Sequence, residues 1–66
     1  MYNCVLIRLK NGMLDFVKGF QDFDDALDAS EKMAKEFIPA NELKKKLKNN
    51  RSDIYYDGIS IYVETL

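Results

Sequence analysis

The chain has 66 residues, of which 47% are hydrophobic and 32% are charged, and its net charge is −1. This length allows one domain, residues 1–66, and the composition is that of a folded globular domain rather than a disordered segment. The near-neutral charge gives the whole molecule no general attraction to nucleic acid or to an anionic membrane. One cysteine and no histidine exclude an internal disulfide and the common zinc frameworks, so the domain depends on good packing or on a partner subunit.

The longest wholly apolar run covers residues 4–7, which is too short for a signal sequence or a membrane span. The lone thiol suits a reducing compartment. Both features predict a cytoplasmic protein that does not enter a membrane.

Asn11-Gly12 separates two apolar runs and predicts a type I′ hairpin turn in which both residues have positive φ. Because a two-residue turn fixes the register, we expect Arg8 to lie opposite Asp15 as a cross-strand ion pair. The same register collects one apolar face from the two strands: Val5, Ile7, Leu9, Leu14 and Phe16.

A helix is predicted after this hairpin. Asp22 is a good N-cap, Asp25 follows it at the spacing of a capping box, and Pro39 ends the helix near Phe37. Residues at helical spacing define the face that the helix buries: Phe23, Ala26, Leu27, Ser30, Met33, Ala34 and Phe37. Asn41 then predicts the cap of a second, short helix from Glu42 to about Lys48, with Leu43 and Leu47 as its only apolar residues.

Asp57-Gly58 is a second hairpin signal. It pairs Tyr56 with Ile59 and leaves Arg51 opposite Glu64, whereas the competing interpretation is one long strand with a bulge at Gly58. One face of this segment is apolar: Ile54, Tyr56, Ile59, Ile61 and Val63. The predicted class is therefore α+β, an antiparallel sheet of three to four strands in the order ββααββ (ββααβ with the bulge), with the main helix across one face.

No enzymatic chemistry is predicted. Without histidine there is no imidazole base, Cys4 has no partner for thiol chemistry, and no glycine-rich phosphate loop or nucleophile elbow is present. The acids Asp22, Asp24, Asp25 and Asp28 are those of a helix start, and the spacing lacks the further ligands of a calcium loop. We therefore expect no metal and no cofactor.

The outer face of the sheet is the leading candidate for function. If the helix covers Val5, Ile7, Phe16, Ile59 and Ile61, the residues Cys4, Leu6, Met13, Val17, Tyr55 and Tyr62 point away from it. A solvent-facing side of an antiparallel sheet is normally polar, so this composition favours a protein-binding surface. The predicted contact residues are apolar anchors with a polar rim: Leu6, Arg8, Asp15, Val17, Tyr55 and Tyr62. Two alternatives are ordinary scattered apolar residues and coverage of this face by the second helix.

A non-catalytic regulatory or inhibitory protein, or the subunit of a homodimer, is the function that these features favour. The hairpin and the spacing Ala26-Leu27 … Met33-Ala34 are similar to those of many small bacterial and phage domains, including the antitoxins of HicB type. The resemblance covers about half the chain and implies no activity, although it is in line with a phage or mobile-element origin.

The runner-up function is nucleic-acid binding through a basic segment that would contact phosphates. Its residues lie within eight positions: Lys44, Lys45, Lys46, Lys48 and Arg51. The alternatives are a solvated helix face and pairing of these bases with the acid-rich start of the first helix.

Overall fold

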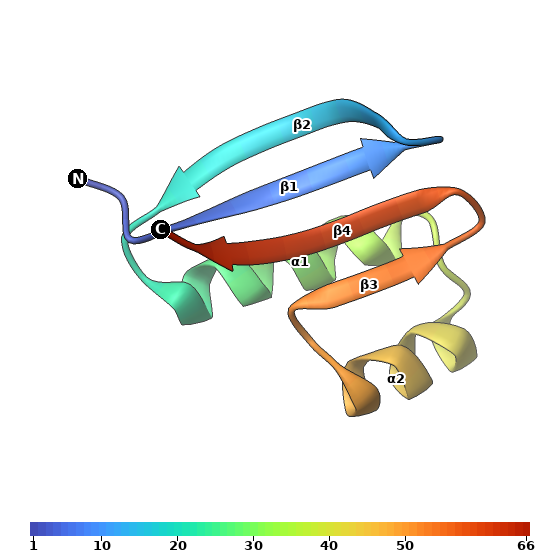
Figure 1. The fold of residues 1–66 in the computed structure, drawn as a ribbon. Helices are drawn as coiled ribbons and strands as arrows, with labels where there is room; N and C mark the ends of the chain where they lie inside the picture. The colour runs from blue at the N-terminus through green and yellow to red at the C-terminus, as the bar shows by residue number, and fades with distance from the viewer.

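A computed structural model describes all 66 residues as one ββααββ chain (Figure 1). The first hairpin is formed by β1 (Cys4–Lys10) and β2 (Met13–Phe20), and the last by β3 (Asp53–Tyr56) and β4 (Ile59–Thr65). Between them lie α1 (Phe23–Lys35) and α2 (Ala40–Asn49). Neither helix has the length and apolar character that crossing a membrane requires.

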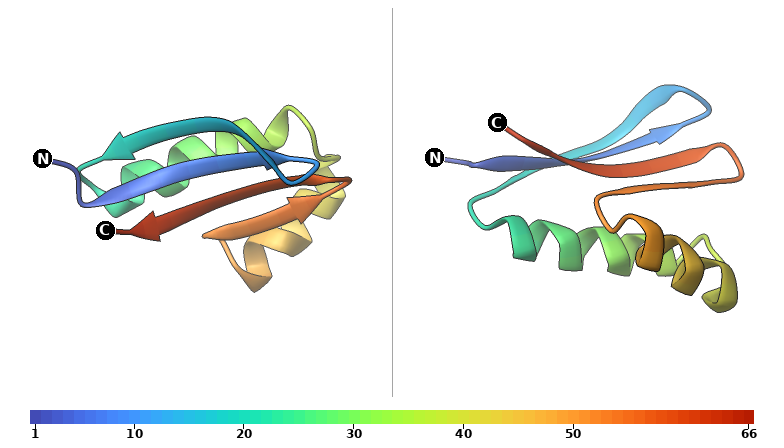
Figure 2. Two further views of the ribbon diagram at one scale, coloured as in Figure 1. Left: turned by 45° about the horizontal axis from the view of Figure 1, so that its top comes forward. Right: turned by 60° about the horizontal axis from the view of Figure 1, so that its bottom comes forward.

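The four strands form one antiparallel sheet in the order β2-β1-β4-β3, so the first and last strands of the chain are its centre. Both helices lie on the same side of this sheet, as the edge-on view in Figure 2 shows. The predicted α+β class and helix-on-sheet packing are confirmed, with four strands rather than three.

The two hairpin turns have the predicted geometry. Asn11 and Gly12 have φ angles of 52° and 81°, and Asp57 and Gly58 have φ angles of 50° and 82°, as a type I′ turn requires. The backbone N–H of Asn11 donates a hydrogen bond to the carbonyl oxygen of Gly58 at 2.7 Å, which ties the two turns together. The alternative of a bulge at Gly58 is wrong, and the pairs from Tyr56–Ile59 to Asp53–Tyr62 form in the predicted register.

The ends of the two helices agree only in part with the predictions from the sequence. The Asp22 carboxylate accepts a hydrogen bond from the backbone N–H of Asp24 at 2.9 Å and caps α1, while α1 ends at Lys35, two residues before the predicted end. The predicted Asn41 cap is wrong, since α2 begins at Ala40 directly after Pro39. Proline, whose ring fixes φ at −56° here, starts the helix without a side-chain cap.

The core lies between α1 and the sheet. A stripe of small residues, Ala26, Ser30 and Ala34, is at most 1% exposed and lets the α1 backbone approach the strands closely. The Ser30 hydroxyl donates to the Leu27 carbonyl oxygen at 2.8 Å, which satisfies the one buried polar side chain. The remaining buried apolar residues come from the strands, the helix ends and α2: Cys4, Leu6, Leu27, Ile38, Leu43, Ile54, Ile61 and Val63.

A β-bulge in the first hairpin overturns the predicted division of β1 between the two faces. Leu9 lies opposite Leu14 as predicted, but Arg8 lies opposite Phe16, and Asp15 is the extra residue. The bulge lets Phe16 share the helix-facing side with the even-numbered residues of β1. Val5 and Ile7, expected under the helix, therefore face outward, while Cys4 and Leu6 are 1% exposed in the core.

Candidate functional site

The outer face of the sheet, the side away from both helices, is defined by the cross-strand pairs, because directly opposed residues share a face. Its central row crosses all four strands in the order Val17, Ile7, Tyr62 and Asp53. The row nearer the turns consists of Leu14, Leu9, Ser60 and Tyr55. The third row consists of Gly19, Val5 and Glu64. Apart from Ser60, Asp53 and Glu64, every side chain on this outer face is apolar or aromatic.

The apolar side chains of the outer face are accessible to solvent. Leu14, Tyr55 and Val17 are 66%, 58% and 52% exposed, and the residues of the central strands are half-buried among their neighbours. The alternative that the second helix covers this face is wrong, because α2 lies beside α1 on the other side of the sheet (Figure 2). Neither helix covers the outer face, and at its far end the Tyr2 ring lies over Gly19.

The structure keeps three of the predicted contact residues on this face and removes two. Val17, Tyr55 and Tyr62 lie on it as expected. Leu6 does not, since its side chain is buried against the helices. Arg8 also points toward the helix side, as a residue paired with Phe16 and Ile61 must.

Arg8 and Asp15 do form the predicted ion pair, but through the bulge rather than by direct opposition. The Arg8 Nε donates to an Asp15 carboxylate oxygen at 2.8 Å. The guanidinium carbon lies 5.5 Å from the ring centroids of both Phe16 and Phe37, which is within the range of a cation–π contact. Arg8 thus closes the end of the core near α1, and its contact holds the Asp15 carboxylate, 41% exposed, toward the helix side rather than on the outer face.

Val5, Ile7, Leu9 and Leu14 are outer-face residues that the sequence reasoning assigned to the helix side. One signal for the correct assignment was available. Asp15 interrupts the apolar residues Leu14 and Phe16, and moving this acid into a bulge turns Leu14 and Phe16 to opposite faces.

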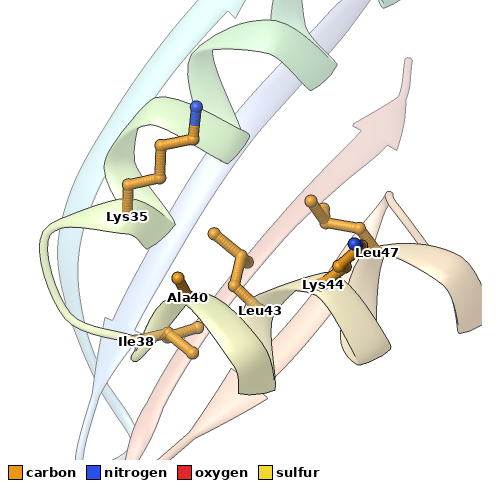
Figure 3. Close-up of a pocket in the computed structure, with 6 residues that line it drawn as sticks. All are labelled: Lys35, Ile38, Ala40, Leu43, Lys44 and Leu47. Carbon is orange, nitrogen blue, oxygen red and sulfur yellow. The ribbon is translucent and has the colours of Figure 1, made fainter.

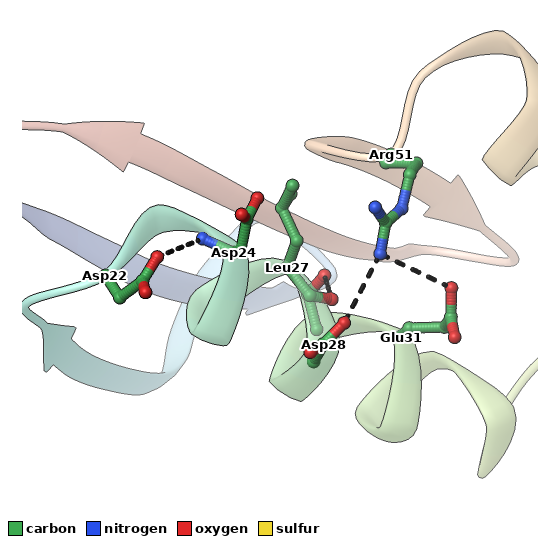
Figure 4. Close-up of polar contacts among 7 residues, drawn as sticks. Asp22, Asp24, Leu27, Asp28, Glu31 and Arg51 are labelled. Atoms are coloured by element: carbon green, nitrogen blue, oxygen red, sulfur yellow. Dashed lines mark hydrogen bonds and ion pairs between the residues drawn. The ribbon is translucent and has the colours of Figure 1, made fainter.

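The basic segment is partly used within the monomer. The Arg51 guanidinium lies 3.5 Å from Asp28 and 3.8 Å from Glu31 on α1 (Figure 4). Arg51 precedes β3, which begins at Asp53, so the strand that was expected to place it opposite Glu64 does not reach it. Lys46 lies over the Tyr56 ring at 5.9 Å. Lys44, Lys45 and Lys48 remain exposed. The predicted pairing of bases with the acidic start of the first helix is confirmed at Arg51 alone.

A hollow with a volume of about 300 Å³ lies between the end of α1 and α2, on the side of the sheet opposite the outer face (Figure 3). Ile38, Leu43 and Leu47 provide its apolar lining, and Lys35 and Lys44 stand at its edges. Two of its apolar residues, Ile38 and Leu43, already belong to the core.

Charge is divided between the two sides of the sheet. The strand bases Arg8, Lys10 and Lys18 all belong to rows that face the helices, and the outer face carries only the acids Asp53 and Glu64. The outer face is therefore an apolar surface with acids at its edge, and it offers contact area rather than reactive groups. Comparisons of the chain with protein-family models, with curated proteins and with solved structures find no match.

Proposed function

We propose that the protein is a small, non-catalytic binding module of the cytoplasm that recognises another protein chain through the outer face. Its role would be regulatory or inhibitory, in the manner of small phage or mobile-element proteins. The observation that carries the proposal is the apolar outer face, which neither helix covers. The one cysteine, buried and free, supports a reducing compartment.

The composition of the outer face is that of a contact surface. Tyrosine and aliphatic side chains occupy its centre and acids lie at its edge, which is the arrangement of a protein interface with an apolar core and a polar rim. The anchors are Val17, Ile7 and Tyr62 in the central row, together with Leu14 and Tyr55 at the two edges. Tyr55 and Tyr62 contribute large rigid area at a low cost in side-chain entropy.

Nucleic-acid binding through residues 44–51 is the less favoured function. Lys46 and Arg51 are engaged with Tyr56 and with the α1 acids, and only three exposed lysines remain on the short helix. Net charge of −1 adds no long-range attraction for phosphates.

Affinity capture with matched variants tests the proposal. The wild-type chain, Val17→Glu and Met13→Glu are immobilised in equal amounts and exposed to extract of the source organism, and the bound proteins are quantified by mass spectrometry. Both substitutions place a glutamate at an exposed apolar position of β2, but Met13 pairs with Lys10 on the helix-facing side. We expect a protein, or the chain itself, that the wild type and Met13→Glu retain and Val17→Glu loses. Identical capture by all three would contradict the proposal.

A further inference from the structure

The outer face is large enough to bind a second copy of itself. The four strands contain 7, 8, 4 and 7 residues, and at about 3.3 Å per residue and about 4.8 Å between strands they make a flat area of roughly 400 Å². The broadest cross-section of the molecule, 35 × 25 Å, sets the upper limit. Two copies packed face to face therefore remove on the order of 800 Å² of accessible surface in total, which is the size of a weak, reversible interface.

The small core is a second argument for self-association. Only 11 of 66 residues are buried in the single chain, no disulfide or metal ligand set supports the fold, and domains below about 80 residues usually need such support or a partner. Packing two outer faces adds a second apolar layer on the free side of the sheet and converts each two-layer subunit into part of a four-layer helix–sheet–sheet–helix sandwich.

The pattern of charge on the outer face is compatible with a copy of the same face. No lysine or arginine lies in any of its rows, so its apolar centre meets no buried cation. Asp53 lies on the edge strand and Glu64 near the end of β4, where both carboxylates stay in water when the centres meet. We infer that the protein forms a two-fold dimer in which the outer faces of two copies pack together, an inference that rests on the proposed function of this face.

The arrangement predicts how the dimer responds to salt and to substitution. Because the contact is apolar and the only charges at its edge have the same sign, salt does not weaken the dimer. In a two-fold interface each substitution occurs twice, so Val17→Glu places two carboxylates in the contact and raises the dimer dissociation constant at least about 100-fold. Met13→Glu leaves it within about twofold of the wild-type value, since Met13 lies on the other side of β2.

The experiment is molar mass by light scattering and by sedimentation equilibrium from about 1 µM to 1 mM, in 0.05 and 1 M NaCl. We expect a dimer with a dissociation constant between about 1 and 100 µM that persists in high salt. Circular dichroism verifies that each variant is folded, and Tyr55→Glu, on the opposite edge of the same face, replaces Val17→Glu if that chain does not fold.

Each outcome separates the dimer from the more general binding function. A wild-type chain that stays monomeric at 1 mM overturns the dimer, and the proposed function then stands only if capture of another protein is lost in Val17→Glu. A dimer that survives both face variants, or dissociates in Met13→Glu instead, also overturns it because the contact lies elsewhere. A monomer whose captured proteins are unaffected by Val17→Glu contradicts both proposals.

Discussion

Deleting Asp15 removes the bulge from β2 while preserving every cross-strand pair. After the deletion Leu14 still lies opposite Leu9, and Phe16 follows it opposite Arg8 as in the intact hairpin. Deleting Val17 from the same strand has a different result, even though it also shortens β2 by one residue. The strand between Leu14 and Lys18 can then keep its pairs at both ends only by bringing Asp15 opposite Arg8, which turns Phe16 outward.

The two deletions differ in the interactions that they remove. Loss of Asp15 removes its partly exposed ion pair with Arg8 (19% and 41% exposed), which is worth about 1 kcal/mol after allowance for solvent screening. The Val17 deletion moves Phe16 out of its contact with the core and away from the Arg8 guanidinium. That change costs about 2 to 4 kcal/mol from lost burial and the cation–π contact.

Urea unfolding followed by circular dichroism measures both costs, at one low protein concentration so that self-association does not contribute. The Asp15 deletion should lower the urea midpoint modestly, by the equivalent of about 1 kcal/mol in the free energy of unfolding. In thermal unfolding, each kcal/mol corresponds to about 4 to 8 °C in Tm for a chain of this size. The Val17 deletion should lower the midpoint by two to four times as much. Equal losses, or a larger loss for the Asp15 deletion, would show that the bulge itself is required and would refute the register argument.

Three further predictions concern the core, the turns and the basic segment. Leu6→Ala removes a side chain that is 1% exposed and should lower the free energy of unfolding, measured by chemical denaturation, by about 2 to 5 kcal/mol. The unmodified chain is expected to have a free energy of unfolding of about 3 to 10 kcal/mol, and a loss below about 1 kcal/mol would contradict the place of Leu6 in the core. Gly58→Ala should lower Tm more than Gly12→Ala, because both have positive φ but only at Gly58 would the new Cβ lie 2.6 Å from a neighbouring side-chain oxygen. Fluorescence anisotropy with a single-stranded oligonucleotide should show no difference between the wild type and a Lys44→Glu/Lys48→Glu double variant; salt-dependent binding that the variant loses would instead support the nucleic-acid function.

The turns, α1 and the last hairpin could be predicted because each is determined by adjacent residues. Asn11-Gly12 and Asp57-Gly58 adopt positive φ at little cost, so the two hairpins require no knowledge of the rest of the chain. The register from Tyr56–Ile59 to Asp53–Tyr62 follows from the second turn alone. Likewise, Asp22 caps α1 through the backbone N–H two residues later, which is a local contact.

The division of β1 between the faces could not be predicted because both of its faces are apolar. Cys4 and Leu6 point to one side of the strand and Val5 and Ile7 to the other. Since all four are apolar, the sequence indicates a strand but does not indicate which side meets the helix. That choice depends on a distant element, since α1 places its small-residue stripe over the even-numbered positions. The bulge at Asp15 then places Phe16 of β2 on the same side as these even-numbered residues. A hairpin without the bulge pairs Arg8 directly with Asp15, so the sequence offered no reason to expect it.

The distribution of charge on the sheet supports the proposal that the outer face is a contact surface. Arg8, Lys10 and Lys18 belong to rows that face the helices, where a long side chain must extend along apolar neighbours before its charge reaches water. On the outer face, a charged residue would reach water at once and cost the monomer little. Yet the outer-face residues of the central strand β1, Val5, Ile7 and Leu9, are all aliphatic. The proposed burial of this face against another protein chain accounts for that choice.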